Sequence, residues 1–315
     1  MADRRPPREP GPASPPPSTP RPPAGERATL FGRLRAAYPE SSGRRLREWL
    51  REGRIRLNNR VARDGRTPIG PADPVVLGPP AEPPFPHAIR LVHQDDALLV
   101  IDKPAGLLTI ATERERHRTA YRLVWDYLTT RRPPRRPFIV HRLDRETSGL
   151  LVIAKSPAAK RHLQAQFEAR ATERVYLALV EGVVAADRGT LESTLVEDRG
   201  LRVRSTRTDA SRRAARRGGR RAITHYRVLA RRRDTTLLEL VLGTGRRHQI
   251  RVQLAELGHP IVGDAAHGSR RDPLRRLCLH ATRLGFRHPV SGAPVGFESP
   301  APDGFHRVGS RPRGG

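Results

Sequence analysis

The chain has 315 residues, which is long enough for one large domain with a buried core and one small domain. It carries 60 Lys+Arg against 32 Asp+Glu, a formal net charge of +28 at pH 7, and such a chain is attracted to polyanions, among which nucleic acid is the commonest. The single cysteine, Cys278, excludes a disulfide framework and a CxxC metal pair and favours a reducing, cytoplasmic setting. No apolar run approaches the roughly 20 residues needed to cross a bilayer. We therefore expect an unexported protein without a membrane segment.

Several stretches are predicted to lie outside folded domains. Residues 1–27 hold ten of the 31 prolines, which predicts a disordered, polyproline-biased tail. Residues 78–87 form a proline-rich linker, and residues 307–315 form a second tail. Residues 202–221 carry nine arginines and one acidic residue, which predicts a mobile basic loop; a role as an RNA clamp and no specific role are both open. Two folded domains remain, at residues 28–80 and 87–306.

The small domain shows a helix followed by a hairpin. Ser42 can cap a helix that ends at Gly53, with apolar residues on one face, namely Leu46, Trp49 and Leu50. Its other face is basic and carries Arg44, Arg45, Arg47 and Arg51. The alternating strand 54–57 then runs into Asn58-Asn59, a pair suited to a tight turn because Asn tolerates positive φ. A solvated basic helix without a ligand is the simpler interpretation of this face.

The large domain begins with two strands, at 89–92 and 98–101, around the turn Asp95-Asp96. The second strand leads into Lys103-Pro104-Ala105-Gly106, where Pro and Gly fix a bend that could line a cleft. An ordinary strand-ending turn is the alternative.

The most informative stretch is HRLDRETSGLLVIAK, residues 141–155. It places Asp144 among arginines, just before a turn and an apolar run long enough for a buried strand. The strand fixes the loop, Gly149 permits an unusual backbone angle, and the flanking positive charge favours an ionised carboxylate. Such a carboxylate can act as a nucleophile or a base, although a solvated turn carboxylate is the simpler alternative.

The remaining elements follow in order. Ser156-Pro157 begins a helix with Ala159, Leu163 and Phe167 on its packed face. Strands are predicted at 175–182, 222–229 and 235–242. Thr244 is predicted to cap a helix with the buried stripe Ile250, Leu254 and Leu257, on whose other face lie Arg247, His248 and Arg251.

Residues 141–155 resemble the signature of the RluA-type family of RNA pseudouridine synthases, and a match of this density is far more specific than a short pattern. TGRRHQIR, residues 244–251, is similar to a second motif of that family, and the strand YLALVEG, residues 176–182, to a third. The segments 102–107, 258–264 and 277–281 look like further family segments; His267 stands where tyrosine is usual. Residues 42–61 resemble the S4 RNA-binding module, with Asn58-Asn59 in place of Asn-Gly.

The resemblance implies an α+β fold: a mixed, largely antiparallel central sheet with flanking helices and a catalytic cleft, preceded by a small α+β S4-like domain. It implies that Asp144 is the catalytic carboxylate, that Arg251 pairs with it, and that Tyr176 is the active-site tyrosine. Contacts to RNA are expected from further basic residues, namely Arg142, Arg44, Arg45, Arg47, Arg246 and His248.

The implied activity is the isomerisation of uridine to pseudouridine, which involves no redox change, so no cofactor and no metal are expected. Large-subunit ribosomal RNA is the preferred substrate and transfer RNA the alternative; a monomer is expected. A non-catalytic RNA-binding assembly factor and a nucleoside-cleaving glycosidase are the competing classes. The first would show degraded motifs, and the second would need a second catalytic carboxylate.

Overall fold

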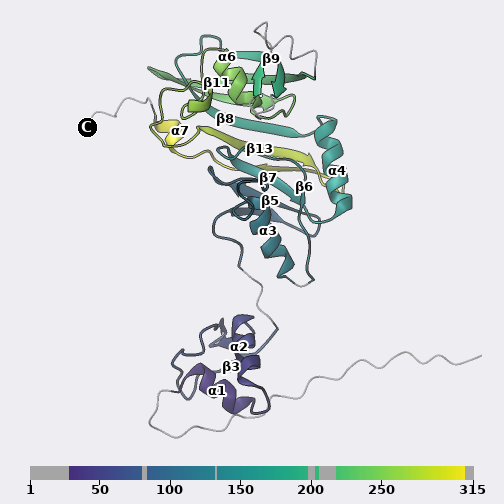
Figure 1. Cartoon of the computed structure of the whole chain (residues 1–315), viewed down its shortest axis with the longest axis vertical. Coiled ribbons are helices and arrows are strands. Elements are labelled where there is room, and N and C mark those ends of the chain that lie inside the picture. Colours follow the sequence, from purple (N-terminus) through teal and green to yellow (C-terminus); the bar gives the residue numbers. More distant parts are fainter. Residues whose placement is uncertain (1–27, 80–83, 132, 198–202, 206–217, 309–315) are drawn as a thin grey trace, which may run out of the picture. The chain divides into compact units, whose positions relative to one another are not determined.

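The computed structural model describes residues 28–79, 84–131, 133–197, 203–205 and 218–308. The chain forms two compact units, Met1–Glu82 and Pro83–Gly315, which we call the N-terminal and the C-terminal unit and describe separately (Figure 1). The tail predicted at residues 1–27 lies outside the described residues. Within the part of the chain that is described, no helix is long and apolar enough to span a membrane.

The N-terminal unit packs two helices against a three-stranded sheet of order β2-β1-β3. Its elements are α1 (Leu30–Ala37), α2 (Gly43–Arg51), β1 (Ile55–Leu57), β2 (Arg60–Val61) and β3 (Val75–Leu77). Helix α2 begins as predicted, because the Ser42 side chain accepts a hydrogen bond from the Arg45 backbone N–H. Asn58 and Asn59 both have positive φ, 51° and 62°, which confirms the tight turn between β1 and β2. Helix α1 was not predicted.

The C-terminal unit is built on one mixed, mostly antiparallel sheet (Figure 1). Within the described residues the sheet has 11 strands, in the order β10-β9-β11-β12-β8-β13-β7-β5-β4, with β14 beside β13 and β6 beside β7. The strands are β4 (Arg90–Gln94), β5 (Leu98–Lys103), β6 (Phe138–Ile139), β7 (Ser148–Ala154), β8 (Glu173–Glu181), β9 (Arg188–Glu197), β10 (Val203–Ser205), β11 (Arg220–Arg231), β12 (Thr235–Leu242), β13 (Leu279–Arg287) and β14 (Pro294–Glu298). Strand β13 runs parallel to β7. The predicted fold class is confirmed.

Helices cover both faces of this sheet, and they are α3 (Ala120–Thr129), α4 (Pro157–Glu168), α6 (Gln249–Glu256), the 3-10 turn η1 (Ala265–His267) and α7 (Gly304–Arg307). From Gly149 to Ala154, strand β7 is apolar without interruption because both of its faces are buried. Leu151 and Ile153 pack in one core cluster together with α3 and α6. Leu150 and Val152 pack in a second cluster together with α4.

Four predictions about local structure are wrong. Residues 203–205 form strand β10 and β11 starts at Arg220, so both ends of the predicted 202–221 loop are paired strands; residues 206–217 lie outside the described residues. The helix predicted from Thr244 starts only at Gln249, because the Thr244 hydroxyl donates to the Gln249 side-chain oxygen at 2.8 Å. Leu257 is 38% exposed and does not extend the buried stripe. Helix α7 reaches Arg307, inside the predicted tail.

The start of β7 depends on Gly149. Its φ is +113°, and a Cβ at this position would lie 2.3 Å from the Ala281 carbonyl oxygen on β13. The residue therefore needs both the backbone angle and the space that only glycine allows. Since β7 follows the loop that carries Asp144, this close contact fixes the loop at its C-terminal end.

Replacing Gly149 with alanine is expected to lower the free energy of unfolding by about 3 kcal/mol or more, through backbone strain and overpacking together. Urea unfolding at neutral pH measures the change. Gly296→Ala is the matched control, because a Cβ at Gly296 would meet nothing within 4 Å; it should stay within about 1 kcal/mol of wild type. Equal stability of the two variants would contradict this account of β7.

Candidate active site

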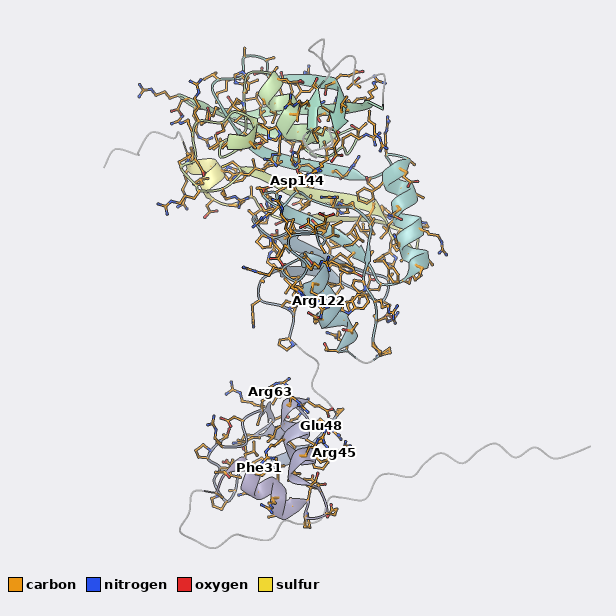
Figure 2. All side chains as sticks on the ribbon, viewed as in Figure 1. Phe31, Arg45, Glu48, Arg63, Arg122 and Asp144 are labelled. Atoms are coloured by element: carbon orange, nitrogen blue, oxygen red, sulfur yellow. The ribbon has the colours of Figure 1, made fainter. Side chains whose placement is uncertain are left out.

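Asp144 lies in the loop that joins β6 to β7, beside the central strands of the C-terminal unit (Figure 2). The backbone of this loop is held by the segment that follows β5. The Thr109 hydroxyl donates to the Leu143 carbonyl at 2.7 Å and accepts from the Leu143 N–H at 3.2 Å. The Gly106 N–H donates to the Arg145 carbonyl at 2.8 Å. Hydrogen bonds on both sides of Asp144 therefore fix its position.

Lys103 ties the two segments together from the interior. It is fully buried, and its ammonium group donates to the carbonyls of Pro104 at 2.9 Å, Leu107 at 2.7 Å and Arg145 at 3.2 Å. Burial lowers the pKa of Lys103 to about 8, although the charges of Asp144 and Glu146 act in the opposite direction. The bend predicted at residues 103–106 is thus hydrogen-bonded to the Asp144 loop and holds it in place.

The carboxylate of Asp144 faces the Arg251 guanidinium and the His248 imidazole without a close contact to either; burial lowers the pKa of His248, so at neutral pH the positive charge comes from Arg251. The Oδ2 of Asp144 lies 3.9 Å from His248 Nε2 and 4.0 Å from an Arg251 Nη1, and the Asp144 side chain is 18% exposed. Among the described residues, no side chain donates a hydrogen bond of 3.5 Å or less to this carboxylate. Asp144 is therefore oriented by positive charge while its oxygens stay open to a ligand.

The expected pairing of Arg251 with Asp144 is only a long contact, because Arg251 has a stronger partner. Its Nε and Nη2 donate to the two carboxylate oxygens of Asp264 at 2.8 and 2.7 Å. Both side chains are buried, 6% and 1% exposed. Burial alone would raise the pKa of Asp264, but hydrogen bonds from Arg251 and His267 outweigh it and lower the pKa to about 2. Asp264 was not predicted as a site residue, although it ends the segment 258–264 that resembles a family segment.

Two histidines complete this network. His248 has a left-handed backbone, φ 52°, at the residue before α6, a conformation that is costly outside glycine and is often found at functional sites. Its ring contacts the His267 ring edge-on, with 5.4 Å between centroids. His267 Nδ1 lies 3.0 Å from Asp264 Oδ1. His267 is therefore a hydrogen-bond partner of Asp264 as well as a packing contact of His248.

Tyr176 lies on β8 and belongs to the core cluster that also contains Leu151 and Ile153. Burial raises the pKa of its hydroxyl to about 12; the charge of Arg174 acts against this shift, and the charge of Asp144 adds to it. Tyr176 is aligned with Ala281 of β13, and Ala281 with Gly149 of β7, so Tyr176 lies one strand away from the C-terminal end of the Asp144 loop. At neutral pH the phenol is protonated.

The expected RNA-contacting residues fall in three places. Arg142 is exposed in the Asp144 loop, and Arg246 is exposed in the turn before α6. Both belong to the C-terminal unit that carries Asp144. His248, the residue before α6, is half-buried and lies beside Asp144. The remaining three lie on α2 of the N-terminal unit and are exposed there, namely Arg44, Arg45 and Arg47.

Glu146 is a further carboxylate at the site that sequence reasoning missed. Its Oε2 lies 3.5 Å from an Arg251 Nη1, and its side chain is 48% exposed. Glu146 and Asp144 thus share one cationic neighbour. A second carboxylate, which the glycosidase interpretation requires, is therefore present near Asp144.

The fold is that of solved RNA pseudouridine synthases. The human protein RNA Pseudouridylate Synthase Domain Containing 1 matches with a TM-score of 0.56 and 25% identity, over 70% of this chain and 86% of that chain. RNA Pseudouridylate Synthase Domain Containing 4, also human, matches with a TM-score of 0.55 and 24% identity, over 69% of this chain and 90% of that one.

Sequence comparison narrows the class to one family. The model of the RNA pseudouridylate synthase family matches residues 97–256. Ribosomal large subunit pseudouridine synthase D from Neisseria meningitidis is 34% identical over 298 residues, 88% of this chain and 78% of the relative. The protein of the same name from Pseudomonas aeruginosa is 34% identical over 287 residues, 85% of this chain and 87% of the relative. The chain belongs to the RluA-type family of RNA pseudouridine synthases, which confirms the resemblance, and it is an isomerase that acts on RNA.

Asp264→Asn is expected to lower the free energy of unfolding at neutral pH by about 3 kcal/mol, because it removes the only buried, doubly hydrogen-bonded carboxylate that Arg251 has among the described residues. Because the folded-state pKa of Asp264, about 2, lies below its usual 3.8, its stabilising effect is complete above pH 3.8 and is lost as the pH falls toward 2. Urea unfolding of both proteins across this range measures the effect, and the difference between them should shrink on acidification.

Asp303→Asn is the matched control, since Asp303 pairs with Arg307 on the surface, with side chains 84% and 79% exposed. An exposed pair should contribute less than about 1 kcal/mol. A difference between wild type and Asp264→Asn that stays constant down to pH 2 would contradict the assigned ion pair.

Proposed function

We propose that this protein converts uridine to pseudouridine in large-subunit ribosomal RNA, with Asp144 as the catalytic carboxylate. The names of the relatives support the choice of RNA. One observation carries the choice of residue: Asp144 is held by backbone contacts and faces His248 and Arg251, yet keeps its carboxylate oxygens available. Both carboxylate oxygens of Asp264, in contrast, accept hydrogen bonds from Arg251, and the side chain is buried.

The reaction breaks the bond between uracil N1 and ribose C1′, turns the base, and joins C5 to C1′. The proton on C5 leaves, and N1 gains one. Positive charge develops at C1′ when the first bond breaks, and a nearby carboxylate stabilises it. Asp144 acts either by attacking C1′ or by removing a ribose proton. Arg251 orients Asp144, and Asp264 is a positioning residue that acts through Arg251.

Tyr176 stacks on the uracil and takes part in the loss of the C5 proton. Because its pKa is raised to about 12, the phenolate is scarce at neutral pH. We therefore favour a route in which the hydroxyl acts through a water molecule over direct proton removal by the phenolate.

The RNA has to release the target uridine from its stack, which costs a few kcal/mol. The exposed Arg142, next but one to Asp144, is placed to fill the vacated space, and Arg246 and His248 contact the nearby backbone. The N-terminal unit acts as an S4-like RNA-binding domain through the basic face of α2, which includes Arg44, Arg45 and Arg47. We propose that the protein is cytoplasmic and monomeric.

Asp144→Asn should slow the release of tritium from RNA labelled at uridine C5 by about a hundredfold to ten-thousandfold, because C5 must lose its hydrogen when it becomes the glycosidic carbon. Binding of the RNA should be retained. Ribosomal and transfer RNA are assayed separately, so that the responsive RNA names the substrate class.

The control is Asp126→Asn, since Asp126 is an exposed partner of Arg122 on α3, and it should release tritium at the wild-type rate. Equal rates for wild type and Asp144→Asn would remove Asp144 from the mechanism. Release from transfer RNA alone would correct the substrate.

Tyr176→Phe removes only the hydroxyl and should slow C5 tritium release by about a hundredfold or more in single-turnover experiments. If the hydroxyl acts in its protonated form, the wild-type rate will show no rise due to Tyr176 between about pH 7 and pH 9. A direct phenolate base would instead give a rise of about tenfold per pH unit, which Tyr176→Phe would abolish. Tyr121→Phe, on α3, serves as the control.

A further inference from the structure

The N-terminal unit contains a hollow that the catalytic mechanism does not use. Its volume is about 440 Å³, which is in the range of small-ligand sites. Three segments form it: the start of α1, one side of α2, and the loop after β2. The lining residues are Thr29, Phe31, Arg47, Leu50, Arg51, Arg63, Gly65 and Arg66.

The floor of the hollow is apolar. Leu50 is buried and Phe31 is half-buried, and the Phe31 N–H donates to the Gly65 carbonyl at 2.8 Å, which joins α1 to the loop. A Cβ at Gly65 would lie 3.0 Å from Phe31 Cβ and 3.1 Å from Leu50 Cδ1. Gly65 therefore keeps open the space above Phe31 and Leu50.

The rim is cationic. The Arg47 guanidinium lies 5.2 Å from the centroid of the Phe31 ring, and Arg63 donates to the Arg51 carbonyl, which directs its guanidinium across the hollow. Among the described residues, the only ion pair made by the four rim arginines joins Arg66 to Asp64 at 3.3 Å, and both side chains are well exposed. The rim thus has a strong excess of positive charge (Figure 2 labels Phe31 and Arg63).

We propose that this hollow binds one unpaired nucleotide of the RNA, with its base on Phe31 and Leu50 and its flanking phosphates on the rim arginines. Bases stack on aromatic rings and on guanidinium planes, and both are present here. A surface that bound phosphates alone would not need an apolar floor, and an apolar protein segment would not match the arginines. The proposal rests on the proposed function only in taking RNA as the ligand of the N-terminal unit.

The first test uses the full-length protein and a short oligoadenylate, which contains no uridine and so cannot report on isomerisation. Binding is measured by fluorescence anisotropy over a range of salt concentrations. Phe31→Leu keeps the charge and removes the ring, so affinity should fall by about tenfold while the dependence on salt stays that of wild type. Equal affinity of wild type and Phe31→Leu would overturn the proposal and leave the hollow to an apolar segment of a protein partner.

The second test changes the charge of the rim and leaves Phe31 and Leu50 in place. Arg47→Gln should weaken binding and reduce the salt slope by about one. Arg56→Gln is the matched control, since Arg56 is an exposed arginine of β1 outside the hollow, and it should bind as wild type does. Equal losses in the two variants would mean that the unit binds RNA through charge alone, and the proposal would fail.

The third test locates the base. An oligoadenylate that carries a photoreactive adenine is cross-linked to the wild-type protein, and the labelled peptides are identified by mass spectrometry. We expect adducts on the peptides that contain Phe31 or Gly65. Adducts confined to the C-terminal unit, or no measurable binding of oligoadenylate, would overturn the pocket while the tritium assay still decides the proposed isomerisation independently.

Discussion

The arrangement of the catalytic centre depends on the buried ion pair between Arg251 and Asp264. Without Asp264, Arg251 would be a buried cation whose remaining carboxylate neighbours are Glu146, at 3.5 Å, and Asp144, at 4.0 Å. A close pair with Asp144 would use up the oxygens that the proposed mechanism needs. With Nε and Nη2 bound to Asp264, Arg251 turns only its remaining nitrogen toward Asp144, at 4.0 Å. A buried ion pair is weak evidence for stability. Here its effect is geometric, because it sets how strongly a third charged group is held.

Lys103 holds the backbone of the Asp144 loop in place, whereas Arg251 orients the Asp144 side chain. The Lys103 ammonium is bound by three carbonyls and by no carboxylate hydrogen bond, so the negative charges of Asp144 and Glu146 stabilise it only through space. Removing that charge from water lowers its pKa to about 8. Two buried cations therefore surround the Asp144 loop, and neither forms a close ion pair with Asp144. Because Lys103 binds carbonyls and Arg251 binds Asp264, the Asp144 carboxylate is oriented while its oxygens remain open.

The sequence predicted the elements that are decided locally. The cap at Ser42 and the continuous apolar run of β7 are signals carried by adjacent residues, and the family motifs brought Asp144 and Arg251 to one site. The missed features depend on contacts between distant segments. The late start of α6 follows from the side chain of Gln249 reaching back to Thr244, and the partner of Arg251 proved to be Asp264, on the turn beyond α6. No helical or strand periodicity reveals either contact.

The charge of the chain also limits what can give it specificity. A net charge of +28 attracts any RNA, and binding through phosphates carries no sequence information and weakens as salt is added. Discrimination between RNAs has to come from contacts to parts of the RNA other than its phosphates. Examples are a carboxylate that acts on one ribose and an apolar surface that binds one base. We propose the open carboxylate of Asp144 as a contact of the first kind and the hollow above Phe31 and Leu50 as one of the second kind. Since one lies in each unit, an RNA that satisfies both has to present a reactive uridine and an unpaired nucleotide at the same time, which is a stricter condition than charge alone imposes.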